Sequence, residues 1–143
     1  MSHKYHRQTL LPEIGEEGQE KLRQARVLIV GVGGLGCPIA LYLATAGVGR
    51  LGLIDNDVVS PSNLHRQILY DEADIDQPKA ECAVHHLQKK NSDIELIAYP
   101  TRLTKENAET VIHGYDIVVD GCDCVCVVFF HFLYSFFLLH SVP

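Results

Sequence analysis

The sequence predicts an α/β fold, in which helices cover both faces of a parallel sheet. Short apolar runs rich in β-branched residues alternate along the chain with segments of helical periodicity. Parallel strands joined in this way need right-handed crossover connections. A glycine-rich turn follows the first apolar run directly, and the length of 143 residues corresponds to about one domain.

Each predicted element has a local reason. Residues 26–30 form an apolar run that ends at a glycine, which is typical of a strand buried on both faces. Pro38 is tolerated in the helix that follows, because the first helical turn does not use the missing N–H. Residues 56–77 are polar and irregular. The predicted strands are 26–30, 51–55, 94–99 and 115–120, and the predicted helices are 13–25, 35–46, 79–90 and a short one around 108–112.

The composition excludes several classes of protein. Hydrophobic residues make up 47% of the chain, and 12 Lys+Arg against 18 Asp+Glu give a net charge of −6. A disordered chain is thereby excluded, and an acidic balance without a basic run argues against nucleic-acid binding. The N-terminus lacks the apolar segment of a signal peptide, and the five unevenly spaced cysteines indicate reduced thiols. We therefore expect a cytoplasmic protein.

The sequence changes character at residue 124. Every Lys, Arg, Asp and Glu lies in residues 1–123, whereas residues 124–143 form an uncharged apolar tail that holds all five phenylalanines. We favour reading the tail as the truncated or misread end of a longer chain. A membrane anchor is disfavoured, because the apolar run is at or below the ~17–25 residues that a spanning helix needs and lacks flanking positive charge. A genuine segment that packs on the sheet edge or on a partner stays open.

A candidate nucleotide site follows the first strand. Gly31, Gly33 and Gly36 form a Gly-x-Gly-x-x-Gly turn between a predicted strand and a predicted helix. Glycines let the backbone turn tightly and approach a phosphate, and the N–H groups of the next helix face the anion. Asp55 ends the second strand, where a carboxylate accepts hydrogen bonds from ribose hydroxyls. The alternative is a tight turn whose glycines serve only helix–strand packing.

The predicted topology places a second acidic turn opposite the glycines. In a strand order such as 3-2-1-4, ligands bind where the carboxyl ends of strands one and four diverge. Asp120 and Asp123 follow the fourth strand and would repel a bare nucleotide unless a divalent cation lies between them. Asp123 is therefore the metal candidate, since Mg²⁺ takes one or two carboxylates together with phosphates. The alternative is that Asp120 or Asp123 only caps a turn.

Two cations, Arg66 and Lys79, flank the predicted phosphate turn. A triphosphate that is being cleaved needs such cations, because charge accumulates on the leaving pyrophosphate. The alternative for either side chain is that it is simply solvated. His85 and His86 lie on a predicted helix among solvated neighbours, and we expect both to be surface residues.

Four separated motifs carry a resemblance to a known family. They are GVGGLG at 31–36, DNDVVSPSNLHRQ at 55–67, QPK at 77–79 and DGCD at 120–123. With these motifs, residues 5–123 resemble the ThiF/MoeB/HesA family, the bacterial relatives of ubiquitin-activating enzymes. The resemblance implies a Rossmann-like sheet, here incomplete at its C-terminus, that binds ATP and Mg²⁺. It also implies an adenylyltransferase that activates the C-terminal glycine carboxylate of a ubiquitin-like sulfur-carrier protein ending in Gly-Gly.

The resemblance also assigns roles to individual residues. Gly34 would lie against the phosphates, Asp55 would hold the ribose, and Asp57 would join the site. Asp123 matches the family's magnesium-associated aspartate, and Arg7 resembles an arginine that reaches the neighbouring subunit's site, which implies a homodimer. The residues that match the family's ATP-contacting positions are Ser62, Asn63, Arg66 and Lys79.

The sequence departs from the family after Asp123. Cys124 stands where the family has an asparagine, and the cysteine pairs that hold zinc in the family do not occur in this chain. Cys122, Cys124 and Cys126 are spaced Cys-x-Cys-x-Cys and supply no fourth ligand, so we expect no zinc site. Residues 1–123 then form the N-terminal part of an ATP-binding domain.

Three functional interpretations therefore remain. We favour the adenylyltransferase, with a slight preference for the thiamine branch over the molybdopterin branch of sulfur-carrier activation. An NAD(P)-binding oxidoreductase shares the glycine turn and Asp55, but it has no use for Arg66, Lys79 and Asp123 together. A catalytically inactive nucleotide-binding fragment is the third interpretation, because much of the family's sequence is missing after Asp123.

Overall fold

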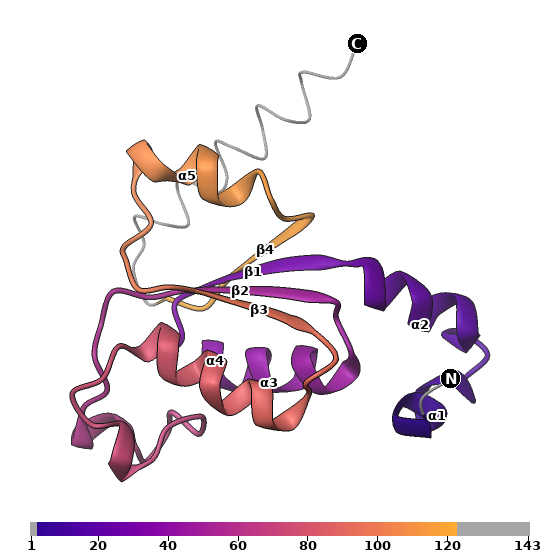
Figure 1. Ribbon diagram of the computed structural model, residues 1–143, viewed down its shortest axis with the longest axis horizontal. Coiled ribbons are helices and arrows are strands. Elements are labelled where there is room, and N and C mark those ends of the chain that lie inside the picture. The colour runs from indigo at the N-terminus through magenta and orange to yellow at the C-terminus, as the bar shows by residue number, and fades with distance from the viewer. Residues whose placement is uncertain (1–2, 123–143) are drawn as a thin grey trace.

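A computed structural model of the chain describes residues 3–122, which fold around a four-stranded parallel sheet (Figure 1). Asp123 and the tail lie outside the described residues. The strand order is β3-β2-β1-β4, which confirms the predicted 3-2-1-4 topology and the α/β class. The strands are β1 (Arg26–Val30), β2 (Arg50–Ile54), β3 (Glu95–Tyr99) and β4 (Ile117–Asp120).

Helices lie on both faces of the sheet, as predicted. In Figure 1, α3 and α4 cover one face and α5 covers the other, while α1 and α2 lie beyond one end of the strands. The strands end at the opposite end of the sheet, where residues 55–78 connect β2 to α4. The helices are α1 (His6–Thr9), α2 (Gly15–Gln24), α3 (Gly36–Ala46), α4 (Lys79–Lys90) and α5 (Lys105–Ile112), and the 3-10 turns are His3–Tyr5, Pro61–Asn63 and Glu72–Asp74.

The central strand β1 explains why two layers of helices are needed. Successive side chains of a strand point to opposite faces of the sheet. Ile29 therefore packs in the core beneath α3 and α4, whereas Leu28 and Val30 pack in the separate core beneath α5. All three side chains are almost fully buried. The run of apolar residues in β1 is thus buried on both faces, as its sequence predicted.

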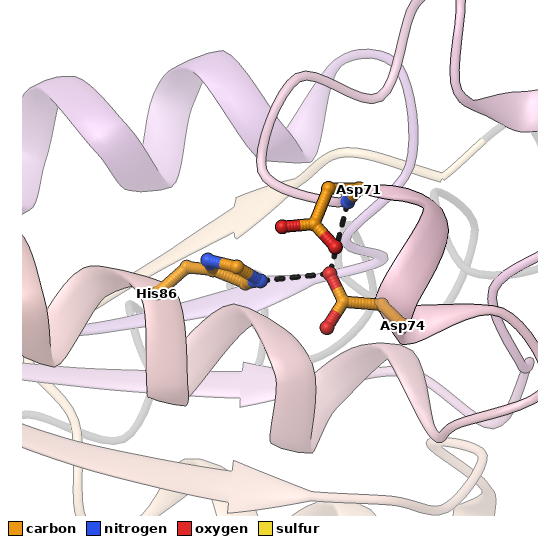
Figure 2. A group of neighbouring side chains, drawn as sticks. All are labelled: Asp71, Asp74 and His86. Atoms are coloured by element: carbon orange, nitrogen blue, oxygen red, sulfur yellow. Dashed lines mark hydrogen bonds and ion pairs between the residues drawn. The ribbon is translucent and has the colours of Figure 1, made fainter.

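The connection between β2 and α4 is fastened to α4 by a polar cluster (Figure 2). Asp71 and Asp74 cap a 3-10 turn reciprocally: Asp71 Oδ1 accepts from the Ala73 amide at 2.9 Å, and Asp74 Oδ2 accepts from the Asp71 amide at 2.9 Å. His86 Nε2 of α4 lies 2.7 Å from Asp74 Oδ2. The prediction of a surface residue is therefore wrong for His86, whose side chain is only 20% exposed, and right for His85.

The cluster predicts a pH-dependent contribution to stability. Partial burial opposes ionisation of Asp74, but hydrogen bonds from Asp71 and His86 outweigh it and lower the pKa of the carboxyl below 3.8. A lowered pKa gives stability that is present above the unfolded value and lost as the pH falls through the folded value. Asp74→Asn should therefore lower the free energy of unfolding by about 1 kcal/mol at pH 7. Urea denaturation should show the difference shrinking as the pH falls below the ordinary pKa of an aspartate, and a difference independent of pH would contradict this account.

Candidate functional site

A cleft of about 820 Å³ lies at the carboxyl ends of the strands, between the glycine-rich turn and the start of α4. This is the edge at which parallel α/β sheets bind their ligands. The turn after β1, the connection after β2 and the turn after β4 all contribute to it. Eight of the predicted site residues line the cleft: Gly31, Gly33, Gly34, Asp55, Asp57, Asn63, Arg66 and Lys79.

The glycines of the turn divide into two kinds. Gly31 has a φ of +84°, which disfavours any side chain, and a Cβ on Gly36 would collide with the Gly31 carbonyl. These two glycines are required by the fold. A Cβ on Gly33 or Gly34 would meet its nearest protein atom at 3.5 or 3.6 Å, which is ordinary contact. Gly33 and Gly34 therefore leave space that belongs to the cleft and not to the protein core.

The peptide groups of Val32 fix the shape of this turn. The Val32 N–H donates to Asp55 Oδ2 at 2.8 Å, and the Val32 carbonyl accepts from the Tyr70 hydroxyl at 2.7 Å and from the Cys37 thiol at 3.3 Å. Burial raises the pKa of both the Tyr70 hydroxyl and the Cys37 thiol, so both groups stay protonated donors at neutral pH. The turn is thus held from β2, from α3 and from the connection after β2.

The acidic residues after β2 are themselves oriented by the backbone. Asp55 Oδ1 accepts from the Asp57 amide at 2.8 Å. Because a carboxylate oxygen has two lone pairs, Asp55 retains acceptor capacity towards a hydroxyl-bearing ligand. Asp57 Oδ2 lies 3.2 Å from Lys79 Nζ, and the Lys79 amide donates to the Asp57 carbonyl at 3.0 Å. Lys79 therefore lines the cleft as a buried cation that is paired with the carboxylate of Asp57.

Arg66 supplies the second cation. Its Cδ lies 3.6 Å from the position of a Cβ on Gly34, so the side chain lies along the glycine turn. Its Nη1 donates to the Ser62 carbonyl at 3.2 Å, and the residue is solvent-exposed. An exposed guanidinium next to a glycine turn has free donors for an anion in the cleft.

Several predicted site residues are placed elsewhere. Ser62 does not line the cleft, and its hydroxyl lies 3.0 Å from that of Ser60. Gly36 lies behind the turn at the start of α3, and Asp120 Oδ1 caps the turn after β4 by accepting from the Cys122 amide at 3.0 Å. Arg7 is exposed on α1, at the other end of the sheet from the cleft. The predicted metal ligand Asp123 lies outside the described residues.

Sequence reasoning missed other parts of the site. Gln67 lines the cleft, as do Gly121 and Cys122. A smaller hollow of about 130 Å³ adjoins Asp55 and is lined by Thr101 and Leu103 after β3. Gln67 ends the motif at 55–67, which was the available signal for it, while the residues after β3 carry no recognisable motif.

Comparison with known proteins agrees with this geometry. The ThiF family matches residues 5–129. The chain is 52% identical over 120 residues to the sulfur carrier protein adenylyltransferase of Thermus thermophilus, a match that covers 84% of the chain and 44% of the relative. It is 54% identical over 122 residues to the mouse adenylyltransferase and sulfurtransferase MOCS3, covering 85% of the chain and 26% of the relative.

A solved structure is similar as well. The crystal structure of Escherichia coli MccB with ATP superposes with a TM-score of 0.69 at 36% identity, over 75% of this chain and 31% of MccB. The chain therefore spans less than half the length of the curated relatives described above.

The two kinds of glycine predict opposite effects of the same substitution. Gly36→Ala should lower the free energy of unfolding by about 2 kcal/mol or more, because the Cβ forces the backbone of the turn to shift. Gly34→Ala should change the stability by less than about 1 kcal/mol, but it places a methyl group in the cleft. Chemical denaturation measures the first effect, and titration with ATP should show weaker binding for Gly34→Ala. Similar stability losses in both variants would contradict the division.

Proposed function

Because the chain belongs to the ThiF family, we propose that it supplies the nucleotide-binding part of an adenylyltransferase that activates the C-terminal glycine carboxylate of a ubiquitin-like sulfur-carrier protein. The observation that carries this proposal is the cleft, in which a glycine turn open to a ligand lies between Arg66 and Lys79. The names of the Thermus and mouse relatives support the reaction type.

The chain's own residues suit the chemistry of adenylation. A C-terminal carboxylate is ionised at pH 7, so the reaction needs no general base. A carboxylate oxygen attacks the α-phosphorus, the bond from phosphorus to the bridging oxygen breaks, and pyrophosphate leaves with the electron pair. The backbone at Gly33 and Gly34 positions the phosphates, Asn63 contacts them, and Arg66 and Lys79 neutralise the departing charge. Asp55 holds the ribose, and the hollow beside Asp55 is suited to the base.

We assign a magnesium ion to the turn after β4. Asp120 Oδ2 is buried without a hydrogen-bond partner among the described residues, so the turn after β4 contains a carboxylate oxygen whose bonding capacity is unused there. Carboxylates are the protein ligands that Mg²⁺ prefers, and the ion would reduce the charge of the phosphates. Asp123, three residues further on, is the proposed ligand because it matches the family's aspartate.

The position of Arg7 supports a homodimer. Arg7 lies on α1 at the far end of the sheet from the cleft of its own chain, so it can reach such a cleft only on a neighbouring copy. We therefore propose that Arg7 completes the site of a second subunit. Residues 1–123 then act as the N-terminal part of the adenylation domain, and the thiamine branch remains the preferred pathway.

The state of the cysteines supports a cytoplasmic setting. Cys37 and Cys82 are free thiols in the structure, which suits the reducing cytoplasm. Within residues 3–122, every helix is too short or too polar to cross a membrane.

An NAD(P)-dependent oxidoreductase is the second candidate for the function, but the two cations beside the glycine turn favour a triphosphate.

Exchange of labelled pyrophosphate into ATP, dependent on a carrier protein ending in Gly-Gly, tests the proposed function. Lys79→Met should reduce the exchange rate about 100-fold, because a buried cation at the phosphates is lost. Lys89→Met, at the exposed last turn of the same helix, should leave the rate unchanged. ATP binding without exchange would support the inactive fragment, and binding of NAD in preference to ATP would support the oxidoreductase.

A further inference from the structure

Gln67 is a buried polar residue that has no role in the adenylation chemistry proposed above. It is 4% exposed, and it lines the cleft beside the glycine turn. Its Oε1 atom is buried and has no hydrogen-bond partner among the described residues. Buried polar side-chain atoms are nearly always hydrogen-bonded, so an unpartnered one next to a ligand cleft calls for an explanation.

The backbone holds Gln67 firmly while its side chain is left unpaired. The Gln67 amide donates to the Asn63 carbonyl at 3.0 Å, and the Gln67 carbonyl accepts from the Tyr70 amide at 3.1 Å. The side chain extends from this turn to the glycine turn, where Nε2 lies 3.5 Å from the position of a Cβ on Gly33. None of residues 3–122 accepts a hydrogen bond from Nε2. The carboxamide is thus positioned by its packing, with its donor directed to the open side of Gly33.

We propose that Gln67 donates a hydrogen bond from Nε2 to a phosphate oxygen of the nucleotide and so positions the phosphate chain over Gly33. This assignment rests on the proposed function, because it requires a nucleotide in the cleft. With Gln67, the proposed phosphate-binding residues include a neutral donor on the buried side of the turn, in addition to the exposed Arg66 and the ion-paired Lys79.

The chemistry of the position favours an amide. At 4% exposure an unpaired cation would be costly, since burial without a partner disfavours the charged form. A neutral N–H donor carries a much smaller desolvation penalty and still bonds strongly to an anion. A role in packing alone does not call for an amide, because an apolar side chain of the same length would fill the space without burying an unpartnered Oε1. The cost of that oxygen is offset only if the Nε2 donor of the same group is used.

Gln67→Met tests the assignment, because it keeps the length of the side chain and removes both the donor and the unpartnered carbonyl. Isothermal titration should show ATP bound about tenfold more weakly, as for the loss of one hydrogen bond to a charged group. Adenosine, which has no phosphate, should lose no affinity. Urea denaturation should show a stability equal to or above that of the wild type. Gln88→Met, an exposed substitution on α4, is the control and should change neither affinity nor stability.

Gln67→Glu is the second variant, since it keeps the shape and replaces the donor by an anionic oxygen. It should weaken ATP binding by more than Gln67→Met and leave adenosine binding unchanged. If the wild type binds ATP and both variants bind it equally well, the assignment of Gln67 is wrong and the proposed function stands. An equal loss for ATP and adenosine, or a large loss of stability in Gln67→Met, would show a structural role instead. A wild-type chain that binds no ATP would overturn the proposed function together with this inference.

Discussion

The hydrogen bonds to the Val32 peptide groups are the constraint on which the rest of the site depends. Asp55 accepts from the N–H of this residue, and Tyr70 and Cys37 donate to its carbonyl. Val32 is itself fully buried, so its backbone groups would otherwise be unpaired in the interior. Fixing the peptide groups of Val32 fixes the backbone of the turn, and with it the side on which Gly33 and Gly34 leave open space. It also joins the turn after β1 to the residue that follows β2, so that two of the segments that line the cleft are hydrogen-bonded to each other.

Electrostatic balance is the second principle of the cleft. Lys79 is 5% exposed and would be costly without a counter-charge, and Asp57 provides one at 3.2 Å from a largely exposed position. The pair keeps a cation available at the start of α4 without a ligand. A polyphosphate that entered the cleft would present a stronger counter-charge than one carboxylate, so Lys79 can change partners while Asp57 returns to water. Arg66, in contrast, is solvated already and needs no such partner.

The sequence was informative where local pattern and tertiary structure agree. The strand β1 and the helix α4 have the predicted boundaries. The continuous apolar run of β1 is typical of a strand buried on both faces, and the helical periodicity of α4 is typical only of a helix. The positions of the glycine turn and of Asp55 at one cleft were also predictable, since both directly follow parallel strands whose carboxyl ends meet at the same edge of the sheet. The observed strand order is the 3-2-1-4 order given as the example for the predicted sheet.

What could not be predicted are the contacts made between distant segments. In the sequence, Tyr70 is a single aromatic residue in a polar connection. In the structure its hydroxyl donates a hydrogen bond to the carbonyl of Val32, 38 positions earlier. The helical periodicity places His86 on the solvent-exposed face of its helix, and only the fold brings Asp74 within hydrogen-bonding distance of it. The role of Gln67 has the same origin, because burial of its carbonyl oxygen depends on how the connection after β2 folds back over the glycine turn. Polar residues of that connection carry no periodicity, so the motif at 55–67 indicates that they belong to a site, whereas the contacts that they make are set by chain packing alone.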